Sequence, residues 1–360
     1  MNNNLNIQNF TYWLISFLGC GYILHIGSSI ILPIIFGTLF AIFMYPIDKK
    51  IIKFAKYKPI SISLSFLSIM IPTGIIGMLF SMQLMRIVSS LPSIEKNLKL
   101  GVDKVLQSIE NVIPAFDLTR TELMEETLSS DLEGPFTFIT QSLVSTTSML
   151  VSSALTLLYT FFILYYRKSL RNFVVFQFKK RSRSDIREAL LQIQETIQAY
   201  IGGLGLVIII LTILNSIGLL IIGVEYAIFW GALAGILAII PYIGTMLGGL
   251  LPALYSLATS DNPYEPLFVL IFYGIVQQIE GNLITPKVVG DKVDINPLFA
   301  IISIIFFGAL WGVGGIILAL PIISIIRIIL EHFEDTKPIA LLLSSDIDSN
   351  PDQFEELAET

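Results

Sequence analysis

The polar side chains between residues 277 and 286 are the ones in this chain whose types and spacing could do chemistry. Glu280 is the only acidic residue well inside any of the long apolar segments. The polar residues around it are Gln277, Gln278, Asn282 and Thr285. A charge at bilayer depth costs roughly 2.5–3.5 kcal/mol on insertion scales unless a partner or water compensates it. Glu280 therefore predicts either a transport or proton-coupling site, or a structural carboxylate hydrogen-bonded across a neighbouring helix break.

The geometry of an α-helix predicts which side chains of this segment share a face. Spacing places Gln277 and Glu280 on one face of a helix and turns Asn282 aside. Pro286 has no N–H to donate to the preceding turn, so a carbonyl near Asn282 is freed.

Two residues elsewhere could contribute to the same site. Tyr242 lies beside a helix break, and Asn215 is a lone amide in another apolar run. A lone amide more often makes an interhelical hydrogen bond than a ligand contact. The candidate substrate- or ion-binding residues are thus Glu280, Gln277, Asn282, Tyr242 and Asn215.

Other kinds of chemistry lack their motifs. The sequence has no G-x-x-x-x-G-K-[ST], no G-x-S-x-G and no H-E-x-x-H. His25 and His332 are not spaced as metal ligands, and Cys20 is the single cysteine. We expect no catalytic residues, no metal and no cofactor. The net charge of −6 gives no footprint for nucleic acid.

The composition of the chain predicts the kind of fold that holds these residues in place. The 360 residues are 54% hydrophobic and 14% charged, whereas a soluble domain carries about 25% charge. Several apolar runs exceed the ~20 residues that span a bilayer. We predict an all-α polytopic membrane protein with about eight membrane segments.

Charge distribution predicts the order of the N-terminal segments. Residues 1–85 are expected to form transmembrane helices. The loop before the third of these helices carries the lysines between residues 49 and 58, which predict that it lies in the cytoplasm. Residues 86–140 are expected to form an acidic extracytoplasmic insert of two helices. The second and shorter of them runs from Thr119 to Gly134. The insert is either a packing cap or a lid that contacts substrate. Residues 141–166 return through the membrane.

Two further segments lie on the cytoplasmic side. Residues 167–200 are basic and predict an interfacial helix, with Lys179–Arg187 against anionic lipid headgroups. Residues 333–360 are acidic and predict a disordered tail. The N- and C-termini are both expected to be cytoplasmic.

Residues 201–332 form the predicted transmembrane core. Its runs 226–258 and 297–330 are too long for one comfortable span, and each contains a helix-breaking cluster. Each run is either one kinked helix or a re-entrant helical hairpin, and the positive-inside rule favours the hairpin. The G-x-x-x-G patterns in this half would let backbones approach closely. The expected hinge and break residues are Pro241, Gly244, Pro286, Pro297, Gly312 and Gly315.

These motifs together resemble one family. Pro241-Tyr242-Ile243-Gly244, Glu280-Gly281-Asn282 with Pro286, and the glycines from Gly308 to Gly315 resemble the autoinducer-2 exporter (AI-2E) family of bacterial permeases. Asn296 stands where many members carry histidine. The resemblance implies an oligomeric protein of the bacterial inner membrane that moves small molecules or ions.

Three functions remain open from the sequence. The first is a secondary transporter that exports a small polar solute, such as an autoinducer-2-like molecule. The second is a monovalent cation/proton antiporter in which Glu280 exchanges the proton. The third is a membrane scaffold that does not transport and that recruits partners through its basic helix and acidic tail.

Overall fold

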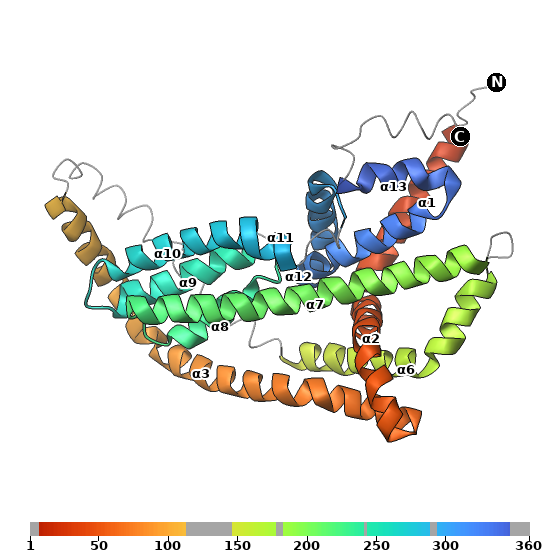
Figure 1. Ribbon diagram of the computed structural model, residues 1–360. Coiled ribbons are helices and arrows are strands. Elements are labelled where there is room, and N and C mark those ends of the chain that lie inside the picture. The colour runs from red at the N-terminus through yellow and green to blue at the C-terminus, as the bar shows by residue number, and fades with distance from the viewer. Residues whose placement is uncertain (1–6, 113–145, 178–182, 241–242, 289–293, 346–360) are drawn as a thin grey trace. The chain divides into compact units, whose positions relative to one another are not determined.

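The computed structural model describes residues 7–112, 146–177, 183–240, 243–288 and 294–345, and all regular structure in these ranges is helical (Figure 1). Within these ranges, six helical segments are long and apolar enough to cross a membrane. They are Ser28–Ala55, Lys58–Ile87, Leu150–Gln177, Arg183–Ile222, Glu265–Val288 and Pro297–Glu331. A shorter N-terminal helix and a hairpin of two shorter helices accompany them. The prediction of an all-α polytopic membrane protein is confirmed.

The chain divides into two compact units. Unit 1 comprises residues 1–65, 148–201 and 291–360, and unit 2 comprises residues 66–147 and 202–290. The predicted helix from Thr119 to Gly134 lies outside the described residues.

Unit 1 is built on the N-terminal and C-terminal helices. It contains α1 (Ile7–Ile26), α2 (Ser28–Ala55), most of α6 (Thr146–Gln177), the first half of α7 (Arg183–Ile222), α12 (Pro297–Glu331) and α13 (Lys337–Leu343). Its hydrophobic core joins Leu39, Ile197 and Leu318. Beside this core, Asp48 is fully buried and forms an ion pair with Arg167. Ser61 Oγ donates a hydrogen bond of 2.6 Å to Asp48 Oδ1.

The 35 residues of α12 turn back on themselves near their middle. Gly312 has φ 63° and ψ −143°, a left-handed backbone that favours glycine. A Cβ added at Gly315 would overlap the carbonyl of Phe307. In a straight helix, two residues eight apart would be separated by about 12 Å. The run 297–330 is therefore a hairpin, as the preferred reading predicted.

Both ends of this hairpin are tied down. At the tip, Trp311 Nε1 donates to the carbonyl of Leu24, 2.9 Å away, at the end of α1. At the base, Arg327 forms an ion pair of 2.5 Å with Asp294, which lies just before the first arm.

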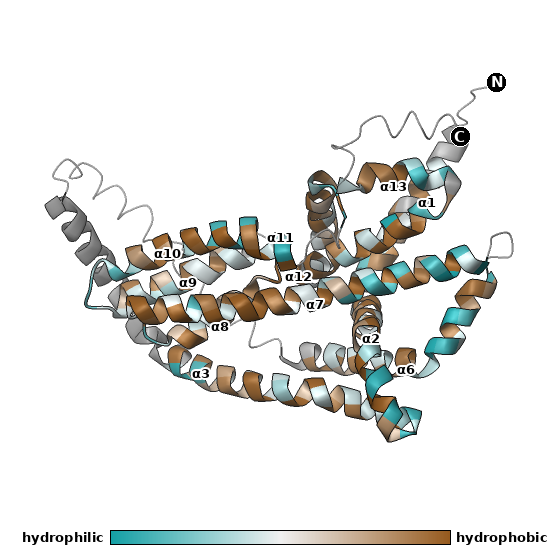
Figure 2. Ribbon diagram, in the orientation of Figure 1, coloured by the Kyte–Doolittle hydropathy of each residue, from teal (hydrophilic) through white to brown (hydrophobic). Residues whose placement is uncertain are grey.

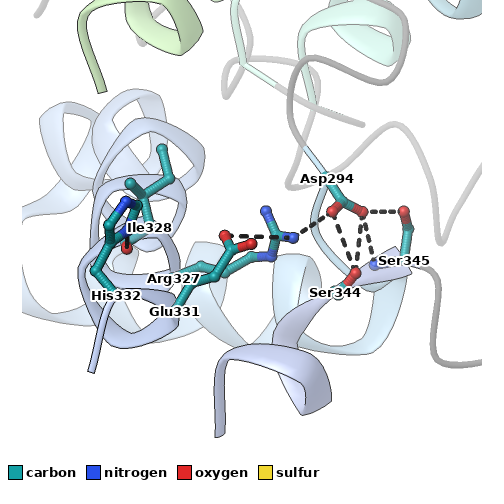
Figure 3. A network of polar contacts seen from close by, with 7 residues as sticks. All are labelled: Asp294, Arg327, Ile328, Glu331, His332, Ser344 and Ser345. Atoms are coloured by element: carbon teal, nitrogen blue, oxygen red, sulfur yellow. Dashed lines mark hydrogen bonds and ion pairs between the residues drawn. The ribbon is translucent and has the colours of Figure 1, made fainter. Parts of the chain in front are cut away.

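The segment that follows α12 is hydrogen-bonded to the base of this hairpin (Figure 3). Asp294 accepts hydrogen bonds from Ser344 Oγ at 3.1 Å and from the backbone N–H of Ser345 at 3.0 Å. The N–H of Asn296 donates to the carbonyl of Leu343. The prediction of a disordered tail is wrong for residues 334–345, which form a 3-10 turn and helix α13. The apolar sequence KPIALLL explains the difference, since it buries Ala340 and Leu343.

Electrostatics favour the ionised form of Asp294. Burial raises the pKa of Asp294, but a hydrogen bond from Ser345 and the charge of Arg327 lower it more. The net pKa lies below the ordinary value for aspartate.

Unit 2 contains a second hairpin. Its arms are α8 (Ala227–Leu237) and α9 (Ile243–Thr259), and α9 also packs against α10 (Glu265–Ile279), as Figure 1 shows. A Cβ at Gly244 would overlap the carbonyl of Leu237, and the tilted rings of Trp230 and Tyr255 lie 5.3 Å apart between their centres. Contacts at both ends of the pair show that the run 226–258 also doubles back.

Glycines on α8 allow close approach to the second half of α7. A Cβ on Gly231 would meet Ser216, and a Cβ on Gly235 would meet Thr212. The G-x-x-x-G pattern therefore serves helix packing here, as predicted.

Two helices continue through boundaries that the sequence placed between segments. The third span and the start of the insert form one helix, α3 (Lys58–Val112). The basic segment and the fifth span form one helix, α7. Figure 2 shows hydrophilic residues along the first part of α7 and hydrophobic residues along the rest. The division between the two units falls after Ile201, next to Gly202, Gly203 and Gly205.

Candidate functional site

Glu280 begins an irregular turn in unit 2. Helix α10 ends at Ile279, residues Glu280–Ile284 form the π-helix η2, and α11 covers Thr285–Val288. The N–H of Thr285 donates to the carbonyl of Glu280, a spacing of five residues. Pro286 accounts for this local widening, because it cannot supply the next N–H of a regular α-helix. Such π-turns are frequent at functional sites.

The carboxylate of Glu280 is half-buried. Among the residues that the structure describes, no hydrogen bond or ion pair satisfies it. Val276, one turn earlier, is buried, whereas Gln277 is exposed. Glu280 thus lies at the edge of the packed interior with its charge uncompensated by described residues.

Asn282 is engaged locally. Its Nδ2 donates to the carbonyl of Gln278 at 2.9 Å and lies 3.3 Å from Gln278 Oε1. Both side chains are exposed. Asn282 is thus held by Gln278, and its contact with a solute stays a prediction.

The π-helix packs near the break of the α8–α9 hairpin. Ile284 and Val276 belong to one hydrophobic cluster with Leu214 of α7 and Ala238, the residue that ends α8. The polar turn and the hairpin tip therefore share a neighbourhood within unit 2. Pro241 and Tyr242, which follow Ala238, lie outside the described residues.

Asn215 lies deeper in the same unit. It is 3% exposed, and its Oδ1 has no hydrogen-bond partner. Its amide oxygen therefore makes no hydrogen bond to a neighbouring helix or to Glu280 within the described residues.

Two other carboxylates in unit 2, which the sequence did not single out, accept side-chain hydrogen bonds. Glu225 accepts a hydrogen bond of 2.9 Å from Tyr255 OH. Glu265 accepts from Ser256 at 2.8 Å and from Ser260 at 2.5 Å. In the sequence, Ser256 and Ser260 lie one helical turn apart shortly before Glu265, and this spacing could have indicated that they bind its carboxylate. These partners make both acids structural and leave Glu280 as the candidate.

The described residues contain no cluster of three or more histidine, cysteine, aspartate or glutamate side chains that could hold a metal ion. The arrangement around Glu280 can therefore offer a carboxylate and amides to a solute, a proton or a monovalent cation.

Comparison with known proteins gives a consistent picture. Residues 13–335 match the family model described as AI-2E family transporter. The protein YueF of Bacillus subtilis is 32% identical over 215 residues, which cover 59% of this chain and 58% of YueF. The protein YhhT of Escherichia coli K12 is 23% identical over 89% of each chain. The AI-2 transport protein TqsA of the same strain is 25% identical over 90% of this chain and 92% of TqsA. The match thus spans little more than half of YueF but nearly all of the other two.

Proposed function

This chain belongs to the AI-2E transporter family, and we propose that it exports a small polar solute as a secondary transporter. The solute would be an autoinducer-2-like molecule or a related metabolite, by analogy with the name of TqsA. We propose transport and not catalysis as its activity. The protein is a multi-pass membrane protein. Its place in the bacterial inner membrane, with both termini cytoplasmic, is part of the proposal.

One observation carries the proposal. A half-buried carboxylate without a described partner lies on a π-turn inside an apolar helix, beside the break of a helical hairpin. Membrane helices tolerate breaks where the backbone lines a cavity or is buried in protein. In transporters such breaks mark binding regions. The region around Glu280 supports a site for a polar solute.

Efflux from proteoliposomes tests the proposal. Purified full-length protein is reconstituted with autoinducer-2 inside, and release is compared with protein-free liposomes. We expect faster release with protein, and at least a tenfold loss in Glu280→Gln, which corresponds to about 1.4 kcal/mol of lost interaction with the solute. Glu265→Gln is the matched control, because the carboxylate of Glu265 is already held by Ser256 and Ser260. Equal release with and without protein would exclude this solute.

A cation/proton antiporter is the second candidate, and the unpartnered carboxylate of Glu280 favours it. A sodium or potassium pulse should then move protons out of acid-loaded proteoliposomes, as a pH-sensitive dye reports. Glu280→Gln should abolish that movement, and Glu265→Gln should preserve it. Proton movement that persists in Glu280→Gln rules out this role for the residue.

Two interactions complete the proposal. The first is assembly as a homo-oligomer. The second is contact of residues 179–187 with anionic headgroups, for which their basic charge provides the support. Binding to vesicles with and without phosphatidylglycerol, compared after charge reversal at Arg183 and Arg187, tests the lipid contact.

A further inference from the structure

Four polar side-chain atoms of unit 2 are buried without a hydrogen-bond partner. They are Asn215 Oδ1, Ser216 Oγ, Trp230 Nε1 and Tyr273 OH. The first three residues are 3%, 8% and 1% exposed. Folded proteins leave few buried polar groups unpaired, because each one forfeits its hydrogen bonds to water. Four such atoms in one unit therefore require an explanation.

The unpaired atoms on α7 and α8 belong to residues that lie at, or next in sequence to, the contact between these two helices. The hydroxyl of Ser216 occupies the space where a Cβ of Gly231 would project. Trp230 precedes Gly231, and Asn215 precedes Ser216. Gly231 thus allows α7 and α8 to approach closely at the height of Asn215, Ser216 and Trp230.

Tyr273 reaches the same region from α10. Its ring packs on Gly249 of α9, where an added Cβ would lie 2.9 Å from Tyr273 Cγ. Tyr273 also packs against the hydrophobic cluster that contains Trp230 and Leu219, one turn after Asn215. All four groups therefore lie in the packed interior of unit 2, on the helices α7, α8 and α10.

The kinds of hydrogen-bonding group restrict the ligand. The indole Nε1 only donates, the amide Oδ1 only accepts, and the two hydroxyls do both. None of the four carries a charge. An N–H in the site disfavours a cation, and an amide oxygen disfavours an anion. A small neutral molecule that both donates and accepts satisfies all of them.

We propose that these four groups line a buried site in unit 2 for a small uncharged molecule that carries hydroxyl groups. Water and a polyhydroxylated solute share this chemistry, and a polar site with several partners can hold either. This inference deepens the proposed export function and rests on it, since it names the charge class of the solute.

The test observes the Trp230 indole N–H directly. Full-length protein with its three tryptophans labelled with ¹⁵N is placed in lipid nanodiscs, and Trp230→Phe identifies the Trp230 signal. Glycerol, erythritol and ribose are the uncharged probes, and sodium chloride is the charged one. We expect a saturable shift with at least one uncharged probe and none with sodium. Cross-relaxation between this N–H and water identifies water as the occupant.

Conservative variants test the assignment of residues. Tyr273→Phe and Ser216→Ala each remove one hydroxyl and should weaken the response about tenfold, the effect of one lost hydrogen bond. Tyr255→Phe is the matched control. Tyr255 belongs to the same hydrophobic cluster, but its hydroxyl already donates to Glu225, so the response should remain.

Two results overturn the proposal. One is a Trp230 signal that responds neither to the uncharged probes nor to water. The other is a saturable shift with sodium that Tyr273→Phe removes. Because binding is measured without transport, a bound polyol in a protein that fails every efflux assay would refute export and leave the site intact.

Discussion

Glu280 and Asp48 show how the surroundings of a carboxylate decide its role. Asp48 is fully buried, pairs with Arg167 and accepts from Ser61. Glu280 is half-buried and has none of these partners among the described residues. A charge with full compensation stabilises one arrangement, whereas a charge without it remains available to a ligand.

Asp48→Asn should destabilise unit 1 strongly. Loss of the carboxylate leaves Arg167 without its buried partner, and breaking such a pair costs about 3–5 kcal/mol. We expect a lower thermal unfolding temperature in detergent for Asp48→Asn. Asp185→Asn, at an exposed aspartate, should leave it within experimental error. The double variant Asp48→Leu/Arg167→Met should recover part of the loss, and a further decrease would contradict the pairing argument.

Asp294 should make the docking of α13 insensitive to pH near neutrality. Its pKa is lowered, so its stabilisation is fully present above the ordinary aspartate value of about 3.9. That stabilisation is lost as pH falls through the lower value of the folded state. Hydrogen exchange of α13 amides, corrected for intrinsic rates, should therefore be constant from neutral pH to about pH 5.

The variant Asp294→Asn provides the comparison for this pH series. It should raise exchange in α13 at every pH, whereas Asp335→Asn, at an exposed neighbour, should not. Protection of α13 that falls on mild acidification would show that another group controls the docking.

The sequence predicted the helices and hairpins more completely than the site. Hydrophobic runs longer than a bilayer and the breaks at Gly244 and Gly312 allowed either a kinked helix or a hairpin, and the positive-inside rule favoured the hairpin. Glycine is required at these breaks because backbones touch at Gly244 and φ is positive at Gly312. The ion-pair partners of Asp48 and Asp294 were not predictable, since Arg167 and Arg327 lie more than 30 positions away in the sequence. The local sequence near Pro286 indicated a freed carbonyl but did not specify a π-turn.

The two hairpins depend on glycines at which a side chain has no room. Gly244 faces the carbonyl of Leu237, and Gly315 faces that of Phe307. Each pair joins the two arms next to the turn. Because backbone atoms cannot move aside as a flexible side chain does, these positions define the spacing of the arms.

Gly244→Ala should open the α8–α9 hairpin near its tip. Overpacking of this kind costs about 1–3 kcal/mol. Gly274→Ala on α10 is the control, because its Cβ would meet no atom within 4 Å, and alanine favours a helix by up to about 1 kcal/mol. A cysteine pair across the hairpin, at positions 234 and 248, should crosslink less readily in Gly244→Ala. Unchanged crosslinking would show that the hairpin absorbs the methyl group.

At the scale of the whole chain, the C-terminal region has two parts, the docked segment 334–345 and the acidic residues that follow it. Residues 334–345 contact the base of a hairpin, so their removal disturbs unit 1 itself. The acidic residues after 345 are the part that could recruit partners without contributing to this contact.

Truncation after Ser345 should therefore leave solute efflux unchanged, whereas truncation after His332 should reduce both efflux and thermal stability. The reason is that only the second cut removes the hydrogen bonds to Asp294 and the burial of α13. Efflux and unfolding are measured on the same preparations. Loss of activity from the shorter cut alone would favour recruitment by the tail.

Helix α7 extends over about 60 Å and supplies its first half to unit 1 and its second half to unit 2. At the division, Gly202 and Gly205 have no atom within 4 Å of where a Cβ would be, so packing does not require them. Each glycine costs the helix roughly 1 kcal/mol relative to alanine. Glycines at this boundary therefore weaken a helix that both units share, and local bending or fraying of α7 costs least there.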